Sequence, residues 1–364
     1  MSIWKYADWL IPIDPTNQIS LGEGQTPLVK SRRIGPECGL SNLYFKLEGT
    51  NPTGSFKDRF SAAGISHMLQ TGKSECIATS SGNTGAALAA YSAAAGLRCR
   101  IAIVEPAPDG KLSQMMAYGA DIFKVKDFGR DPDVDRRTFM SLKKLAQGAG
   151  RVLQVSGFVF SPEGMCGVET ISFELAEQLD EIQHVFCPAG GGGMCVGVAR
   201  GFAALVRKNR LKRSPAVHCV QPEGNDTIAS RLRRGMDRAG NVEGKSKISG
   251  LQVSSVVDGH LAIEACRPTG GTGYIVSDND IWHLQKRLAR EEGIFSEPAG
   301  AVALAGAIKA MATGEIQADA PIVCMVSGIG FKDTVAVDRI NDNVECPTIE
   351  LAVLESEAIA VGGQ

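Results

Sequence analysis

The sequence lacks the hallmarks of several common protein classes. None of its ten cysteines forms a Cys-x-x-Cys pair and its five histidines show no metal-ligand spacing, so we predict no metal site. It contains no run of about 18 apolar residues, which argues against a transmembrane helix. The first residues also lack the charged and apolar blocks of a signal peptide. These absences predict a protein that neither spans a membrane nor binds zinc.

The sequence also lacks a surplus of either charge. It has 38 lysines and arginines against 40 aspartates and glutamates, a net charge of -2. This balance argues against a nucleic-acid binder, which carries a basic surplus, and against a polybasic membrane anchor. Cysteines that lie in apolar runs indicate buried thiols in a reducing compartment, so we expect a cytoplasmic protein.

What the sequence does contain is a regular alternation of strand-like and helix-like segments. The length of 364 residues suggests about two domains. Alternation predicts parallel sheets with helices on both faces, an α/β fold. Residues 240–273 have no clear period and are predicted to form a long loop or flap, and the tail after Pro347 is apolar enough to pack. Strands are predicted at 43–47, 76–79, 100–104, 121–125, 152–155, 185–188, 217–220 and 322–326, and helices at 61–70, 86–95, 111–118, 133–147, 169–179, 194–208, 227–234, 277–292 and 299–311.

Lys57 is the candidate catalytic residue. It follows a turn that contains Asn51, Pro52 and Gly54, which places it in the predicted first turn of a helix. The positive end of the helix dipole disfavours a charged amine there. A neutral amine is a nucleophile that can form a Schiff base with an aldehyde, which is how lysine serves pyridoxal phosphate (PLP) chemistry. Most lysines at helix starts are only solvated charges, so the assignment needs support from other segments.

Three further polar or glycine-rich turns each follow an apolar, strand-like run, at residues 80–85, 190–193 and 326–330. In an open α/β sheet, ligands bind at the carboxyl ends of strands, so these loops and the lysine are expected to share one crevice. Each turn also has a simpler interpretation, as a helix cap, a different nucleotide loop or a plain turn. The second lacks the P-loop pattern, and neither half opens with the glycine pattern of a nicotinamide dehydrogenase.

Five spaced motifs around these loops resemble the fold-type II PLP enzymes, and among them most closely the threonine synthases. The resemblance covers roughly residues 20 to 335, in the family's order, with motifs at 21–28, 54–59, 80–84, 297–301 and 327–333. It implies an α/β fold of two open parallel-sheet domains, with PLP in the cleft between them. The smaller domain would comprise residues 60–158, and the larger one residues 1–59 plus 159–364. The resemblance also implies a homodimer.

The resemblance implies a role for each matching residue. Lys57 would hold the cofactor as a Schiff base and later move protons, Asn83 would hydrogen-bond the ring hydroxyl oxygen, and Ser327 would face the pyridine nitrogen. A neutral hydroxyl can leave that nitrogen unprotonated, a setting that serves elimination and replacement at the β or γ carbon rather than transamination. Backbone amides and a helix dipole would hold the cofactor phosphate. Hydroxyl groups at the start of another helix would bind the substrate carboxylate. The phosphate loop would be Gly190, Gly191, Gly192 and Gly193, and the carboxylate ligands Ser80, Ser81 and Thr84.

The sequence departs from the threonine-synthase pattern where the phosphate of the substrate O-phosphohomoserine would bind. The family has an arginine a few residues before the Gly-x-x-Thr that matches residues 167–170, whereas residues 161–166 contain no arginine and one acid, Glu163. An acid repels a phosphate ester. We therefore expect a threonine-synthase-like lyase that performs β/γ-elimination or replacement on a small amino acid. A β-replacement synthase resembling cysteate synthase and a serine/threonine dehydratase are the alternatives. A PLP-binding paralogue without turnover is the non-enzyme alternative, against which the intact Lys57 argues.

Overall fold

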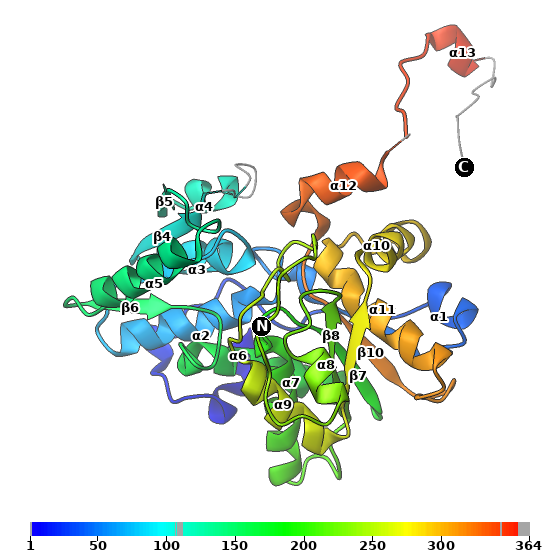
Figure 1. Cartoon of the computed structure of the whole chain (residues 1–364), viewed down its shortest axis with the longest axis horizontal. Helices are drawn as coiled ribbons and strands as arrows, with labels where there is room; N and C mark the ends of the chain where they lie inside the picture. Colours follow the sequence, from blue (N-terminus) through cyan, green and yellow to red (C-terminus); the bar gives the residue numbers. More distant parts are fainter. Residues whose placement is uncertain (1, 106, 108–111, 343, 356–364) are drawn as a thin grey trace.

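The computed structural model describes residues 2–105, 107, 112–342 and 344–355. They form two α/β domains, each built on its own sheet (Figure 1). The larger sheet has the strand order β1-β2-β10-β7-β8-β9, in which β1 is antiparallel to β2 and the other neighbours are parallel. Its strands are β1 (Leu28–Lys30), β2 (Leu43–Leu47), β7 (His184–Pro188), β8 (Ala216–Pro222), β9 (Gly273–Val276) and β10 (Ile322–Val326).

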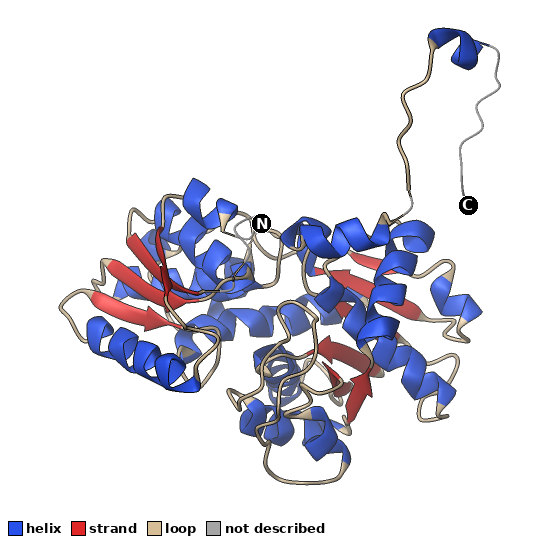
Figure 2. Cartoon of the chain, turned by 45° about the horizontal axis from the view of Figure 1, so that its top comes forward, coloured by secondary structure: helices blue, strands red, loops and turns tan. Residues whose placement is uncertain are grey.

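The smaller sheet is entirely parallel and has the order β5-β4-β3-β6. Figure 2 shows the two sheets as separate units with helices packed around each. The strands are β3 (Glu75–Thr79), β4 (Arg98–Val104), β5 (Asp121–Val125) and β6 (Arg151–Gln154). The predicted α/β fold with two parallel-sheet domains is therefore confirmed, whereas the exact domain boundaries stay a prediction.

The helices begin and end for local reasons that the sequence makes visible. Before α10, the Ser277 hydroxyl accepts the backbone N–H of Asp280 at 3.1 Å, and Gly293 ends the helix with a φ of 69°. The helices are α1 (Ile34–Glu37), α2 (Lys57–Gln70), α3 (Asn83–Ala94), α4 (Ser113–Ala117), α5 (Pro132–Ala146), α6 (Pro162–Gln178), α7 (Gly193–Arg207), α8 (Ala229–Arg233), α9 (Gly259–Cys266), α10 (Asp278–Glu292), α11 (Pro298–Ala312), α12 (Thr334–Ile340) and α13 (Leu351–Glu355).

Two predictions about local structure are wrong. Residues 240–273 are not one long loop, because they contain α9 and the first residue of β9. Helix α9 has only eight residues and starts at a glycine, and no described side chain caps it, so its sequence carries few helix signals. Helix α6 starts at Pro162 rather than near residue 169, because proline is well tolerated in the first turn of a helix.

Close contacts between helices hold the site-bearing parts of the two domains together. A Cβ added at Gly167 of α6 would lie 2.1 Å from the Arg59 carbonyl oxygen of α2, and one added at Gly201 of α7 would lie 2.4 Å from the Glu169 carbonyl oxygen of α6. Only glycine allows backbones to approach so closely. The resulting α2–α6–α7 layer connects the helix that starts at Lys57 to the helix that follows the glycine loop.

The C-terminal segment does not pack as predicted. Within one copy of the chain, residues 344–355 lead away from both domains and end in α13, which stands apart in both views (Figures 1 and 2). Separately, among the described residues no helix is long and apolar enough to cross a membrane.

Candidate active site

Lys57 is the first residue of α2 and lies where the two domains meet. The turn before it requires Gly54, whose φ is 90°. The Phe56 N–H donates to the Ser327 carbonyl at 3.1 Å, and Ser55 bridges to Gly328. These contacts place the lysine turn directly beside the loop that follows β10, as the sequence predicted for two loops at strand ends.

The Lys57 amine is held in a setting that favours its neutral form. Burial lowers its pKa from 10.5 to about 8, while the nearby carboxylates of Asp258 and Glu297 act in the opposite direction. The amine donates a hydrogen bond to the Ser156 hydroxyl at 2.9 Å and lies 4.3 Å from the centre of the Phe56 ring. A sizeable neutral fraction near neutral pH is what a nucleophilic lysine requires.

Ser156 joins Lys57 to the loop that precedes α3. Its hydroxyl lies 2.9 Å from the Thr84 hydroxyl as well as from the lysine amine, so the three groups form a chain of hydrogen bonds. Thr84 belongs to the first turn of α3, and the preceding loop is tightened by the Gly82 N–H, which donates to the Ser80 hydroxyl at 3.2 Å. Ser81 lies half-buried in the same loop. Hydroxyl groups and free amides therefore gather at the start of α3, where an anion is favoured.

Glu297 connects the small-domain loop to the loop after β10. Its two carboxylate oxygens accept the Asn83 side-chain amide at 3.1 and 3.0 Å, and one of them accepts the Ser327 hydroxyl at 3.1 Å. Glu297 and Ser327 are almost fully buried. Asn83 and Ser327, two of the residues expected around the cofactor ring, are therefore brought to one carboxylate from opposite domains.

The glycine loop has the shape of an anion cradle. Gly192 has a φ of 100°, and no described side chain caps α7, so the first backbone amides of this 15-residue helix are open to a ligand. A Cβ added at Gly192 would lie 2.8 Å from the Ile228 side chain, and one added at Gly193 would lie 2.7 Å from the Met165 side chain. The left-handed φ of Gly192 favours glycine there, and both positions are closely packed, so a side chain at either one would displace a neighbour.

Asp258 ties the glycine loop to the loop that carries Ser156. Its carboxylate accepts the backbone N–H groups of Phe158 at 2.8 Å and Val159 at 3.0 Å, while its own N–H donates to the Gly191 carbonyl at 2.9 Å. Burial raises the pKa of Asp258, and the two N–H donors and the Lys57 amine oppose that change. A single acid therefore links the glycine loop to the loop that carries the serine in contact with Lys57.

A buried ion-pair network anchors α2 immediately after the lysine. The fully buried Arg59 guanidinium pairs with Glu48 at 2.7 Å and with Glu174 at 2.5 Å, and Lys46 also pairs with Glu174, at 2.7 Å. These partners come from β2, the turn after it and α6. Asp58 instead accepts the backbone N–H and the hydroxyl of Thr53, which closes the turn before Lys57. Arg59 therefore has a structural role that fixes the start of α2.

The structure gathers the residues that the sequence singled out and adds three more. Lys57 and Thr84 meet at Ser156, and Asn83 and Ser327 meet at Glu297. No motif in the sequence marked Ser156, and Asp258 lies in the stretch that was wrongly expected to be one long loop. Glu297 stood inside a recognised motif, but either capping a helix or orienting a cofactor loop was compatible with that motif.

Comparisons with known proteins give the relatives of this chain. A family model described as pyridoxal-phosphate dependent enzyme matches residues 19–328. The threonine synthase of Methanocaldococcus jannaschii is 33% identical over 95% of this chain and 85% of its own length, and that of Methanosarcina acetivorans is 33% identical over 100% and 87%. The structure of threonine deaminase isoform 2 from Solanum lycopersicum matches with a TM-score of 0.75 and 22% identity, over 93% of this chain and 92% of that one.

Proposed function

The chain belongs to the family of pyridoxal-phosphate dependent enzymes, and we propose that it is a threonine-synthase-like lyase that performs elimination or replacement at the β or γ carbon of a small amino acid. The observation that carries this proposal is Lys57, a lysine with a pKa of about 8 that lies at the junction of the two domains. Its neighbours include a glycine loop suited to a phosphate and a helix start suited to a carboxylate.

The residues present fit the cofactor. Lys57 would hold the aldehyde carbon, and the open amides of residues 190–193 would hold the phosphate. Asn83 and Ser327 would contact the edge of the ring. The cofactor supplies an electron sink for negative charge at the substrate α-carbon. The start of α7 supports this assignment, because no described side chain caps its first backbone amides.

The protein's own groups then divide the remaining tasks. The hydroxyl groups of Ser80, Ser81 and Thr84 bind the substrate carboxylate together with the amides at the start of α3. The Lys57 amine, oriented by its hydrogen bond to Ser156, moves the proton at the α-carbon. Because Ser156 contacts both Lys57 and Thr84, the binding of the carboxylate and the orientation of the base are coupled.

The leaving group is the open part of the assignment, and one observation favours a group other than phosphate. Ser161 stands in the stretch where the family arginine is expected, and its hydroxyl accepts the Val155 N–H at 3.1 Å. Of the two carboxylates whose charges raise the pKa of Lys57, Asp258 has the larger effect. Residues 161–166 thus offer no arginine to bind a phosphate ester. This supports a β-replacement synthase or a serine/threonine dehydratase as the alternative to a threonine synthase.

The wider assignments follow from the same proposal. We take residues 60–158 as the smaller domain and residues 1–59 with 159–364 as the larger one, with a small amino acid bound between them. A cytoplasmic homodimer is the expected form. An intact Lys57 with a lowered pKa argues against a paralogue that binds the cofactor without turnover.

The proposal is tested with a substrate screen on PLP-loaded protein, in which the visible spectrum and the products are followed. O-phosphohomoserine, O-phosphoserine, serine and threonine are each offered with and without sulfite. Release of threonine and phosphate from the first establishes a threonine synthase, and a product from the others establishes one of the alternatives. The variant Lys57→Ala should lose both the cofactor's visible band and turnover, while Lys144→Ala, an exposed lysine on α5, serves as the control. A Lys57→Ala protein that retains the band after dialysis would overturn the proposal.

A further inference from the structure

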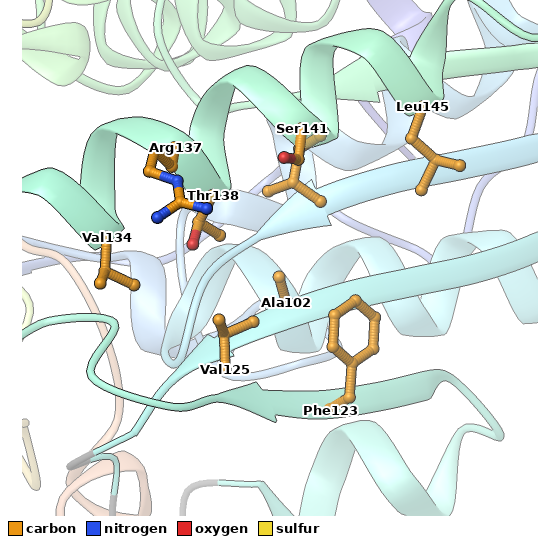
Figure 3. A pocket seen from close by; sticks show the side chains of 9 residues that line it. Ala102, Phe123, Val125, Val134, Arg137, Thr138, Ser141 and Leu145 are labelled. Carbon is orange, nitrogen blue, oxygen red and sulfur yellow. The ribbon is translucent and has the colours of Figure 1, made fainter.

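An apolar cavity lies away from the active site, on the small domain. This cavity, here called the α5 groove, has a volume of about 540 Å³. Ala102, Phe123 and Val125 line it from the sheet, and Val134, Leu142 and Leu145 line it from α5. Figure 3 shows the side chains of the helix and of the strands pointing toward one another across this space.

The α5 groove exists because one face of the small sheet is only half covered. Helix α5 packs against β3 and β6, at one side of the sheet, and no other described helix fills the space between α5 and the edge strand β5. Parallel sheets are normally covered by helices on both faces. Phe123 on β5 consequently remains 42% exposed, although it faces apolar neighbours. The groove therefore lacks one apolar element of roughly helical size.

The same chain has an apolar segment that is exposed rather than packed against either domain. The C-terminal arm, defined as residues 344–355, exposes five large apolar side chains: Val344, Ile349, Leu351, Val353 and Leu354. Leu351 is 67% exposed and Leu354 53% exposed. These two lie three residues apart in α13, so they share one face of the helix. An arm of this composition gains free energy wherever it can bury that face.

Charge favours an encounter between the arm and the groove. The arm contains three glutamates, Glu345, Glu350 and Glu355, and no lysine or arginine. The β5–α5 segment, residues 121–146, contains seven lysines and arginines against five aspartates, a net charge of +2. Arg137 of this segment lines the groove itself. An acidic arm is therefore attracted to a segment with a net positive charge that places Arg137 at the groove.

The position of the arm indicates whose groove it enters. In both views the arm leaves the large domain after α12 on the side away from α5 of its own chain (Figures 1 and 2). We propose that the C-terminal arm of one copy docks into the α5 groove of a second copy, with Leu351 and Leu354 as the buried anchors. This is a helix-in-groove contact, in which an amphipathic segment supplies the missing cover.

Site-directed cross-linking tests the docking directly. Ser141 lines the groove and Ala352 lies on the arm, so the variant Ser141→Cys/Ala352→Cys, in a Cys346→Ser background that removes the exposed native thiol, should form a disulfide between copies on mild oxidation. The expected result is a band of twice the chain mass on a non-reducing gel. Ser141→Cys alone in the same background is the matched control. A cross-link without doubling of mass, or no cross-link, would overturn the proposal.

Light scattering on the PLP-loaded protein provides a second test that does not depend on turnover. Removal of residues 344–364, or the substitution Phe123→Asp in the groove, should each lower the order of association relative to the full chain at equal concentration. Mixing the two deficient proteins should restore association in part, because one brings the intact groove and the other the intact arm. Unchanged association in either deficient protein would overturn the proposal, as would a failure of the mixture to recover any association.

Discussion

The pH dependence of cofactor capture is the prediction that tests the candidate site most directly. Burial lowers the pKa of Lys57 to about 8, so the amine is charged below that pH and neutral above it. Only the neutral amine attacks the cofactor aldehyde. The rate at which cofactor-free protein captures PLP should therefore rise with pH and level off above about pH 8.

The magnitude follows from the position of the pKa. At about pH 7.5, an amine with a pKa of about 8 is roughly one quarter neutral, whereas an ordinary lysine near 10.5 is about one part in a thousand neutral. The site thus raises the reactive fraction by about two orders of magnitude. Because the carboxylates of Asp258 and Glu297 stabilise the charged amine, the variants Asp258→Asn and Glu297→Gln should each move the midpoint to lower pH.

The assay is stopped-flow absorbance of cofactor-free protein mixed with PLP, between about pH 6 and pH 10. Lys57→Ala should show no slow appearance of the cofactor band, and Glu181→Gln, which removes an exposed carboxylate, should leave the midpoint in place. A midpoint above about pH 9.5 in the wild-type protein would refute the reasoning, because it would mean that burial does not dominate at Lys57. A midpoint that rises in Glu297→Gln would refute the assigned direction of the carboxylate's effect.

Three further predictions concern the surroundings of the lysine. Arg59→Met should destabilise the protein by about 3–5 kcal/mol in chemical denaturation, because it leaves the buried Glu48 without its cation and Glu174 with Lys46 alone. Arg98→Met, at an exposed pair, should leave stability nearly unchanged. Gly192→Ala should weaken PLP binding roughly tenfold or more in an equilibrium titration, because residue 192 has a φ of 100° and a Cβ there would lie 2.8 Å from the Ile228 side chain. The control Gly96→Ala, at a position with a φ of 67° and open space, should leave PLP affinity unchanged. Ser327→Asp should lower the rate of elimination by favouring a protonated ring nitrogen, and unchanged kinetics would show that Ser327 does not face the ring.

Much of the fold could be predicted because its signals are local. Strands β5 and β10 coincide with their predicted ranges, and α10 follows Ser277, the first residue of its predicted range. Alternation, capping and apolar runs act within a few residues, which makes such elements visible in the sequence. The failures are also local in origin. Helix α9 has a glycine at its start and few residues, so tertiary packing rather than its own propensity holds it in place.

The site divides in the same way. Lys57, Asn83, the glycine loop and Ser327 could be proposed from sequence, because each follows a strand or opens a helix in a recognisable motif. Ser156 could not, because its role depends on a hydrogen bond to a lysine from a distant part of the chain. Asp258 could not either, since its carboxylate acts by holding two loops together.

The sequence by itself determined the order of strands and helices, the lysine turn, the glycine loop and hence the chemistry that the cleft can perform. Only the tertiary structure decided how far the pKa of Lys57 is lowered. Burial and the charges of Asp258 and Glu297 depend on which residues surround the amine in the folded chain. The tertiary structure also decided which apolar surfaces remain uncovered, the α5 groove and the C-terminal arm. Local propensity acts between neighbours in the chain, whereas dielectric environment, Coulomb interactions and packing depend on distances in space.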